Sequence, residues 1–192
     1  MRSTIAPVVT ALTLFACVPI ANAAEYAIDP AHTFVTFEID HLATSTNRGR
    51  FDGKQGSVQF DRSAKIGKVD ITVDTTSLNT GVPAFTKHLN GPDLLDTSKY
   101  PTARFVADKF TFNGDMVSEV SGMLTLMGKT NPVTMKAIRF NCYVSPMVKR
   151  EVCGGDFETT FDRTQFGLNY GVEWGFSKNV HLLVQIEALK QE

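Results

Sequence analysis

The chain lacks an excess of charge of either sign. Its 192 residues include 19 lysines and arginines against 20 aspartates and glutamates, a net charge of −1. Nucleic-acid-binding domains usually carry a basic patch or stripe, and proteins that bind anionic membrane surfaces carry basic clusters. Because the sequence has neither pattern, we expect no nucleic-acid partner and no electrostatic attachment to a membrane.

A long apolar run that would span a membrane is also missing. The best candidate, residues 5–20, is interrupted by Pro7 and Pro19 and falls short of the roughly 20 apolar residues that a spanning helix needs. It follows a positive start at Arg2 and precedes residues 21–23, Ala-Asn-Ala. This order, with a small-x-small pattern at its end, is typical of a signal peptide.

We therefore expect residues 1–23 to be a cleaved signal peptide and the protein to be exported. Cleavage leaves residues 24–192, or 169 of the 192 residues, a length that suits one domain with a single core. No stable membrane span then remains. Cys17 leaves an alternative open, a lipoprotein leader in which this cysteine carries a lipid anchor.

Cysteine is scarce, with three residues in the chain. Loss of Cys17 with the leader leaves Cys142 and Cys153, which in an exported chain predict one disulfide. Closing a loop of this size stabilises a fold by about 3 kcal/mol in the chain-entropy model. Two cysteines are too few for a structural zinc site, which needs four ligands.

Catalytic motifs are absent as well. The sequence contains no Gly-x-Ser-x-Gly, no His-Glu-x-x-His and no thiol outside the predicted disulfide. The four histidines lack the close spacing of a metal site; they are His32, His41, His88 and His181. We expect a protein that is not an enzyme and that holds no metal and no cofactor.

What the sequence does have is alternation of apolar and polar residues, which predicts strands with one buried face. Eight segments show strand character: residues 35–41, 51–61, 69–76, 102–110, 122–127, 133–140, 157–162 and 180–188. Short strands at regular spacing predict an all-β sandwich or barrel. The parity slips between Phe51 and Val58, where Gly53 and Gly56 predict a β-bulge.

One segment departs from this rhythm. Residues 77–101 lack alternation and are rich in glycine and proline. Residues 84–89 and 93–98 are each predicted to form a short helix, the second capped by Asp93. An insertion of this length in a compact barrel is often a lid or a binding element.

Parity also predicts which side chains face the interior. The apolar lining is expected to be Val35, Phe37, Ile39, Val69, Ile71, Val73, Phe105, Leu124 and Val184. His41 shares this parity, with three roles open: a hydrogen-bonded core histidine, a contact to a ligand headgroup, or a metal ligand. An eight-stranded barrel either fills with side chains or encloses one slender ligand, and composition does not decide between the two.

Several short motifs occur in a fixed order between Tyr26 and Ala188. They are Ile28-Asp29, His32-Thr33, Val35-x-Phe37-x-Ile39-x-His41-Leu42, Lys87-His88-Leu89, Asp93-Leu94-Leu95-Asp96, Lys99-Tyr100-Pro101, Phe105, Leu124-Thr125-Leu126-x-Gly128-Lys129-Thr130-x-Pro132-Val133-Thr134 and Asp162-Arg163-x-x-Phe166-Gly167-Leu168. In this order the chain resembles the YceI-like, or polyisoprenoid-binding, family of bacterial periplasmic proteins.

The resemblance implies a lipocalin-like antiparallel eight-stranded β-barrel that carries an isoprenoid-type lipid, such as a quinone tail or a prenyl phosphate, in the periplasm. A few polar groups near the mouth would then bind the headgroup. The candidates are His41, Lys87, His88 and Asn90, with Arg104 and Arg163 as further ones. A lipid-modifying enzyme and a stress-linked interaction protein with a filled barrel remain alternatives, and the oligomeric state, a homodimer included, stays open.

Overall fold

The computed structural model describes residues 23–192. The predicted signal peptide up to residue 22, with Cys17, lies outside the described residues. The strands are β1 (Ala24–Ile28), β2 (Phe34–His41), β3 (Ser45–Asp61), β4 (Ile66–Asn79), β5 (Thr102–Asn113), β6 (Met116–Leu126), β7 (Lys129–Val144), β8 (Glu151–Asp162) and β9 (Asn179–Lys190). Helix α1 (Pro83–Leu89) and the 3₁₀ helices η1 (Arg163–Phe166) and η2 (Val172–Trp174) complete the elements. Over residues 23–192, no helix has the length and apolar character needed to cross a membrane.

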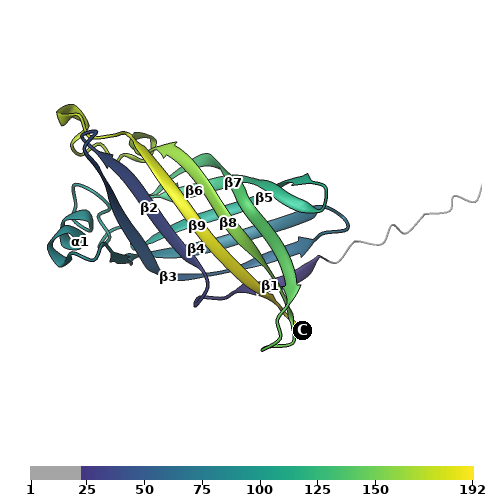
Figure 1. Ribbon diagram of the computed structural model, residues 1–192. Coiled ribbons are helices and arrows are strands. Elements are labelled where there is room, and N and C mark those ends of the chain that lie inside the picture. The colour runs from purple at the N-terminus through teal and green to yellow at the C-terminus, as the bar shows by residue number, and fades with distance from the viewer. Residues whose placement is uncertain (1–22) are drawn as a thin grey trace, which may run out of the picture.

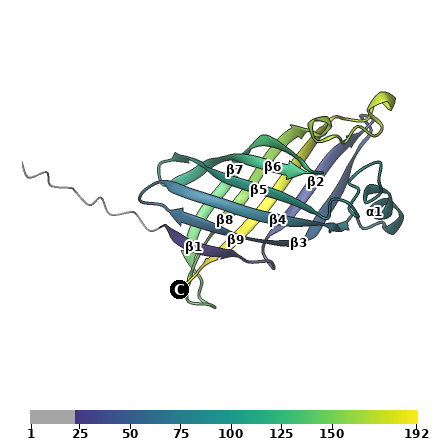
Figure 2. The same cartoon turned by 180° about the vertical axis from the view of Figure 1, so that it is seen from behind.

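The strands close into a ring in which every pairing is antiparallel (Figures 1 and 2). Strand β1 pairs with residues 57–60 of β3 and residues 188–190 of β9. Strand β2 pairs with residues 45–51 of β3 and residues 180–185 of β9. Since β1 and β2 share one position between β3 and β9, the nine strands fill eight positions. This confirms the predicted eight-stranded antiparallel barrel.

The break between β1 and β2 is stabilised by side chains that replace ladder hydrogen bonds. The Asp29 carboxylate accepts a hydrogen bond from the backbone N–H of Ala31 at 2.8 Å and lies 2.8 Å from Nδ1 of His32. Thr33 is almost fully buried, and its hydroxyl bonds to both the carbonyl and the N–H of Glu187 on β9. Buried backbone N–H and C=O groups need such partners, and these side chains supply hydrogen bonds to the backbone where the strand is broken.

The predicted bulge in β3 is confirmed. Pairing with β4 shifts register between Phe51 and Gly53, and the N–H of Gly53 instead donates to the Ser77 hydroxyl at 2.7 Å. A bulge bends its strand, which helps a sheet curl into a barrel. The strands run longer than the alternation predicted, because pairing continues through polar residues at the barrel ends.

The predicted disulfide is confirmed. Cys142 and Cys153 lie directly opposite each other on β7 and β8, with their Cα atoms 4.1 Å apart. Beyond them the hairpin loop is closed by a hydrogen bond from the N–H of Ser145 to the carbonyl of Arg150 at 2.9 Å. The disulfide therefore joins two strands that are already neighbours.

The insertion after β4 contains one of the two predicted helices. Helix α1 begins at Pro83, where a proline needs no hydrogen-bond partner for its nitrogen. The helix predicted over residues 93–98 is wrong, because this segment forms successive turns. Asp96 adopts a left-handed backbone (φ 42°), and its N–H donates back to the carbonyl of Gly91 at 2.9 Å. A left-handed residue cannot continue a right-handed helix.

Helix α1 and the segment between β8 and β9, residues 163–178, lie at the same end of the barrel. In Figure 1 they are the teal helix and the yellow-green loop, and Figure 2 shows the same arrangement from behind. The C-terminus and the β7–β8 loop lie at the opposite end. These two ends differ in how they close the interior.

Candidate functional site: an apolar cavity in the barrel

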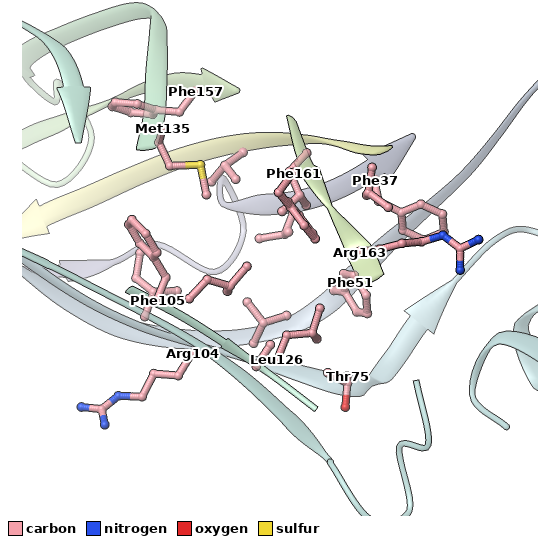
Figure 3. Close-up of a pocket in the computed structure, with 18 of the residues that line it drawn as sticks. Phe37, Phe51, Thr75, Arg104, Phe105, Leu126, Met135, Phe157, Phe161 and Arg163 are labelled. Atoms are coloured by element: carbon pink, nitrogen blue, oxygen red, sulfur yellow. The ribbon is translucent and has the colours of Figure 1, made fainter. Parts of the chain in front are cut away.

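The barrel encloses a cavity of about 600 Å³, with lining side chains from all nine strands. This volume lies within the range of roughly 300–1,000 Å³ that small-molecule sites occupy. Figure 3 shows apolar side chains that reach into the space from opposite walls, among them Phe37, Phe105 and Phe161. The barrel is therefore hollow, which the sequence alone did not establish.

All nine side chains predicted to line the interior lie on the cavity wall. They are Val35, Phe37, Ile39, Val69, Ile71, Val73, Phe105, Leu124 and Val184. Their strands contribute alternate residues to the wall because successive side chains of a strand point to opposite faces. The parity argument therefore placed them on the correct face.

The cavity is closed at one end and open at the other. Near the C-terminal end its lining residues are buried, with Tyr26, Phe60 and Phe140 only 3–8% exposed. At the α1 end the lining includes the exposed His88 and Trp174, and Trp174 is 59% exposed. The cavity therefore opens at the end formed by α1 and residues 163–178, an opening that we call the mouth.

Helix α1 turns one face toward the cavity. Phe85, His88 and Leu89 line the cavity, whereas Lys87 and Asn90 line a separate hollow beside the helix. The sequence predicted Lys87 and Asn90 as headgroup contacts together with His88, and the structure places them elsewhere. The reason is helical geometry: Phe85, His88 and Leu89 are spaced i, i+3 and i+4 and share one face, whereas Lys87 lies about 200° around the helix from Phe85. Asn90 is the residue that follows the helix as its C-cap.

Residues 163–178 are held in place by Arg163. Its side chain is 4% exposed and donates three hydrogen bonds to backbone carbonyls: to Ser177 at 2.9 Å, Leu168 at 2.8 Å and Tyr170 at 2.9 Å. Burial lowers the pKa of this guanidinium from its usual value. Arg163 lines the cavity, yet its donors already bind the loop, so its role in the free protein is to position the mouth.

Aromatic contacts connect the elements around the mouth. The ring of His88 on α1 meets Tyr170 edge-to-face at 5.3 Å, and Tyr170 meets Trp174 at 5.4 Å. His41, at the end of β2, packs edge-to-face on Phe176 at 5.1 Å. These aromatic residues of the 163–178 segment were missed by the sequence reasoning. The signal was present as a glycine- and aromatic-rich stretch without alternation.

Arg104 is part of the cavity wall through its stem alone. Its head turns away from the other labelled side chains in Figure 3 and pairs with Asp70 on the outer face, Nε to Oδ1 at 2.8 Å. The hydrogen bond from Arg104 lowers the pKa of Asp70. Asp70 lies between Val69 and Ile71, which line the cavity, and therefore points outward. The ion pair keeps the charge of Arg104 outside the cavity.

Tyr26 and His181 are two further polar residues whose side chains are paired. Tyr26, at the closed end, donates its hydroxyl hydrogen bond to Glu151, and burial followed by this bond raises the pKa of the phenol. On the outer face His181 lies between Glu38 and Glu158, at 3.3 and 3.1 Å. Within residues 23–192, no three histidine, cysteine or acidic side chains are grouped so that they would hold a metal ion. What the described wall offers a ligand is apolar surface.

Comparison with known proteins gives a consistent result at the sequence level. A family model described as the YceI-like domain matches residues 26–188. A UPF0312 protein of Pseudomonas aeruginosa (strain LESB58) is 36% identical over 174 residues, which cover 89% of this chain and 90% of that protein. The similarity therefore spans the whole barrel.

Solved structures show the same fold. The crystal structure of a Campylobacter jejuni YceI protein superposes with a TM-score of 0.69 at 22% identity, covering 80% of this chain and 91% of that one. A polyisoprenoid binding domain from Saccharophagus degradans superposes with a TM-score of 0.63 at 18% identity, covering 86% and 98%. At these identities the likeness concerns the fold.

Proposed function

Because the chain belongs to the YceI-like family and its barrel encloses an apolar cavity of about 600 Å³, we propose that it binds a long isoprenoid-type lipid. A quinone tail or a prenyl phosphate has the required chemistry. The observation that carries this proposal is the cavity wall, which nine strands build almost entirely from apolar side chains. The Saccharophagus degradans neighbour, described as a polyisoprenoid binding domain, supports the same ligand class.

The affinity follows from burial of the tail. Each buried methylene contributes about 0.8 kcal/mol, so a prenyl chain binds tightly without any specific contact. A hollow barrel with an apolar wall is also suited to a carrier, since the cavity that would hold the chain is already present. The free energy gained by burying the tail is partly offset by the cost of ordering the flexible lipid chain, so the lipid can still be released.

Recognition of the headgroup falls to the mouth. The polar side chains on the wall there include His41 and His88, each held by an aromatic neighbour, Phe176 and Tyr170. An imidazole offers one donor and one acceptor in its neutral form. These two histidines are therefore our candidates for contact with a quinone oxygen or a phosphate at the mouth.

We place this binding role in the periplasm. The support comes from the predicted signal peptide, residues 1–23, and from the Cys142–Cys153 disulfide, which fits an oxidising compartment. Cell fractionation followed by mass measurement of the intact protein tests the location. A mature N-terminus at Ala24 supports it, whereas a full-length chain in the cytoplasm contradicts it.

We propose a binding rather than a catalytic role. The two imidazoles at the mouth have aromatic rings as their neighbours, and neither is aligned with a nucleophile. The remaining charged group on the described wall, Arg163, holds backbone carbonyls. Such groups position a ligand but supply no activated attacking group.

The proposal is tested by identifying the lipid that copurifies with the protein. Protein is isolated without detergent from a quinone-producing bacterium, measured by native mass spectrometry and then extracted for lipid analysis. We expect an isoprenoid-type lipid at one per barrel. The matched control, Ile71→Trp, places a large side chain in the cavity and is expected to lose the lipid while remaining folded. An empty wild-type barrel that also takes up no added prenyl lipid refutes the proposal.

A further inference from the structure

Four aromatic rings form a layer across the closed end of the cavity. Phe60 on β3 packs against Phe110 at 6.2 Å, Phe112 at 6.2 Å and Phe140 at 5.6 Å between ring centroids. Phe110 and Phe112 stack on each other at 6.5 Å. We call these four residues the floor cluster. Aromatic pairs in these geometries are favourable beyond their burial alone, so the layer is well fixed.

The cavity ends at this layer. Phe60, Phe110 and Phe140 line the cavity, whereas Phe112 does not and lies against the rings of Phe60 and Phe110. Three rings thus face the ligand and the fourth supports them. No tail can extend past the floor cluster without displacing a ring.

The position of Phe110 depends on a missing side chain on the neighbouring strand. A Cβ atom added to Gly67 on β4 would lie 2.6–2.8 Å from atoms of the Phe110 ring. Gly67 shares the inward parity of Val69 and Ile71, which line the cavity. A larger residue at Gly67 therefore pushes the ring of Phe110 toward the barrel axis.

The floor fixes how far a tail can reach into the barrel. Carbons between the mouth and the floor cluster are buried in the cavity of about 600 Å³, whereas the further carbons of a longer chain lie outside the mouth and bury little surface.

We propose that the floor cluster sets the length of prenyl chain that this protein buries. Phe60, Phe110 and Phe140 act as the stop against which the tail end rests. The inference rests on the proposed function and adds to it a limit on the buried length, which the apolar wall alone does not impose. The residues named here determine specificity and take no part in any reaction.

A ladder of prenyl alcohols with two to eight isoprene units tests the limit. Each alcohol displaces a fluorescent apolar probe from the delipidated, full-length mature protein. We expect affinity to rise by about tenfold or more for each added unit, given the gain from each buried methylene, until the tail reaches the floor cluster, and then to level off. An affinity that rises without a break to eight units overturns the proposal.

Two substitutions are expected to move this plateau in opposite directions. Phe110→Ala opens space on the order of the 150 Å³ of an engineered core cavity and moves the plateau about one unit longer. Gly67→Ala pushes the Phe110 ring inward and moves it about one unit shorter. Phe34→Ala is the matched control: it is the same deletion at a residue outside the floor cluster and the cavity wall, where the ring lies beneath Arg50 and Lys54, and it leaves the plateau in place. Phe110→Leu gives a smaller shift of the same sign if the alanine variant does not fold.

The outcomes separate this inference from the proposed function. If no alcohol of any length displaces the probe, the lipid-binding proposal itself fails. If the alcohols bind but the plateau stays fixed in folded variants of Phe110 and Gly67, the length limit is refuted while lipid binding stands. A shift with Phe34→Ala equal to that with Phe110→Ala also refutes it, because the lining rings would then not be the stop.

Discussion

Replacement of Arg163 by methionine is expected to destabilise the protein strongly, and the mouth most of all. Methionine keeps an unbranched apolar stem of similar length but removes three hydrogen bonds to backbone carbonyls. A bond from a charged donor is worth about 1.5–3 kcal/mol. The Leu168 bond is buried, whereas the Ser177 and Tyr170 bonds are partly buried, so two carbonyls regain some water. We therefore expect a net loss of about 3–5 kcal/mol.

Tryptophan fluorescence measures this loss of stability at the mouth, because Trp174 is the single tryptophan of the chain. Urea unfolding followed by tryptophan emission measures the 163–178 segment, and far-UV circular dichroism measures the barrel. In the wild type the two transitions should coincide. In Arg163→Met the tryptophan transition should come at lower urea, and the melting temperature should fall by at least about 6 °C at 2–4 °C per kcal/mol.

Arg104→Met is the matched control. Arg104 also lies on the cavity wall, but its head pairs with Asp70 in an exposed setting. Exposed ion pairs contribute about 0–1 kcal/mol, so this variant should unfold close to the wild type. The reasoning is wrong if Arg163→Met stays within 1 kcal/mol of the wild type, or if the two variants lose equal stability.

Three further predictions follow from the fold. Replacing both Cys142 and Cys153 by alanine should lower the free energy of unfolding by about 3 kcal/mol, and reductant should then have no further effect in urea titrations. Val184→Trp should weaken probe binding at least tenfold with little loss of stability, because the added ring enters a hollow; a filled core would instead lose about 1–3 kcal/mol. Asp70→Asn should cost about 0.5 kcal/mol at neutral pH and nothing well below pH 4. The pKa of Asp70 is depressed in the folded state, so its stabilisation is present above the unfolded pKa and is lost as pH falls; equal losses in urea titrations at both pH values contradict this.

The barrel and its lining were predictable because a strand has a simple period. Alternation assigns each residue to a face, so Val35 and Val184 were placed inside although they are far apart in the chain. Register and closure were beyond that argument, since they depend on which strands pair. The hollow interior also had to come from the structure, because the same composition fills a core equally well.

The mouth was harder to predict because loops and short helices have no comparable period. Lys87 lies on helix α1 outside its cavity face, and Asn90 follows the helix as its C-cap. The rotation of a seven-residue helix cannot be read from its sequence. Arg163 was considered as a headgroup contact, whereas the structure shows it bound to backbone carbonyls. Those carbonyls belong to residues that become neighbours only when the loop folds.

The shared position of β1 and β2 has a consequence for how the protein folds. Both strands pair with β9, and Thr33 reaches a hydrogen-bond partner that lies 154 positions later in the chain. The ring therefore cannot close until the last strand has been synthesised. Contacts of such long sequence separation fold slowly. For a chain that begins with an export leader, as we propose, this delay would keep the polypeptide unfolded, and hence able to thread through a translocation channel, until its C-terminal strand arrives on the far side.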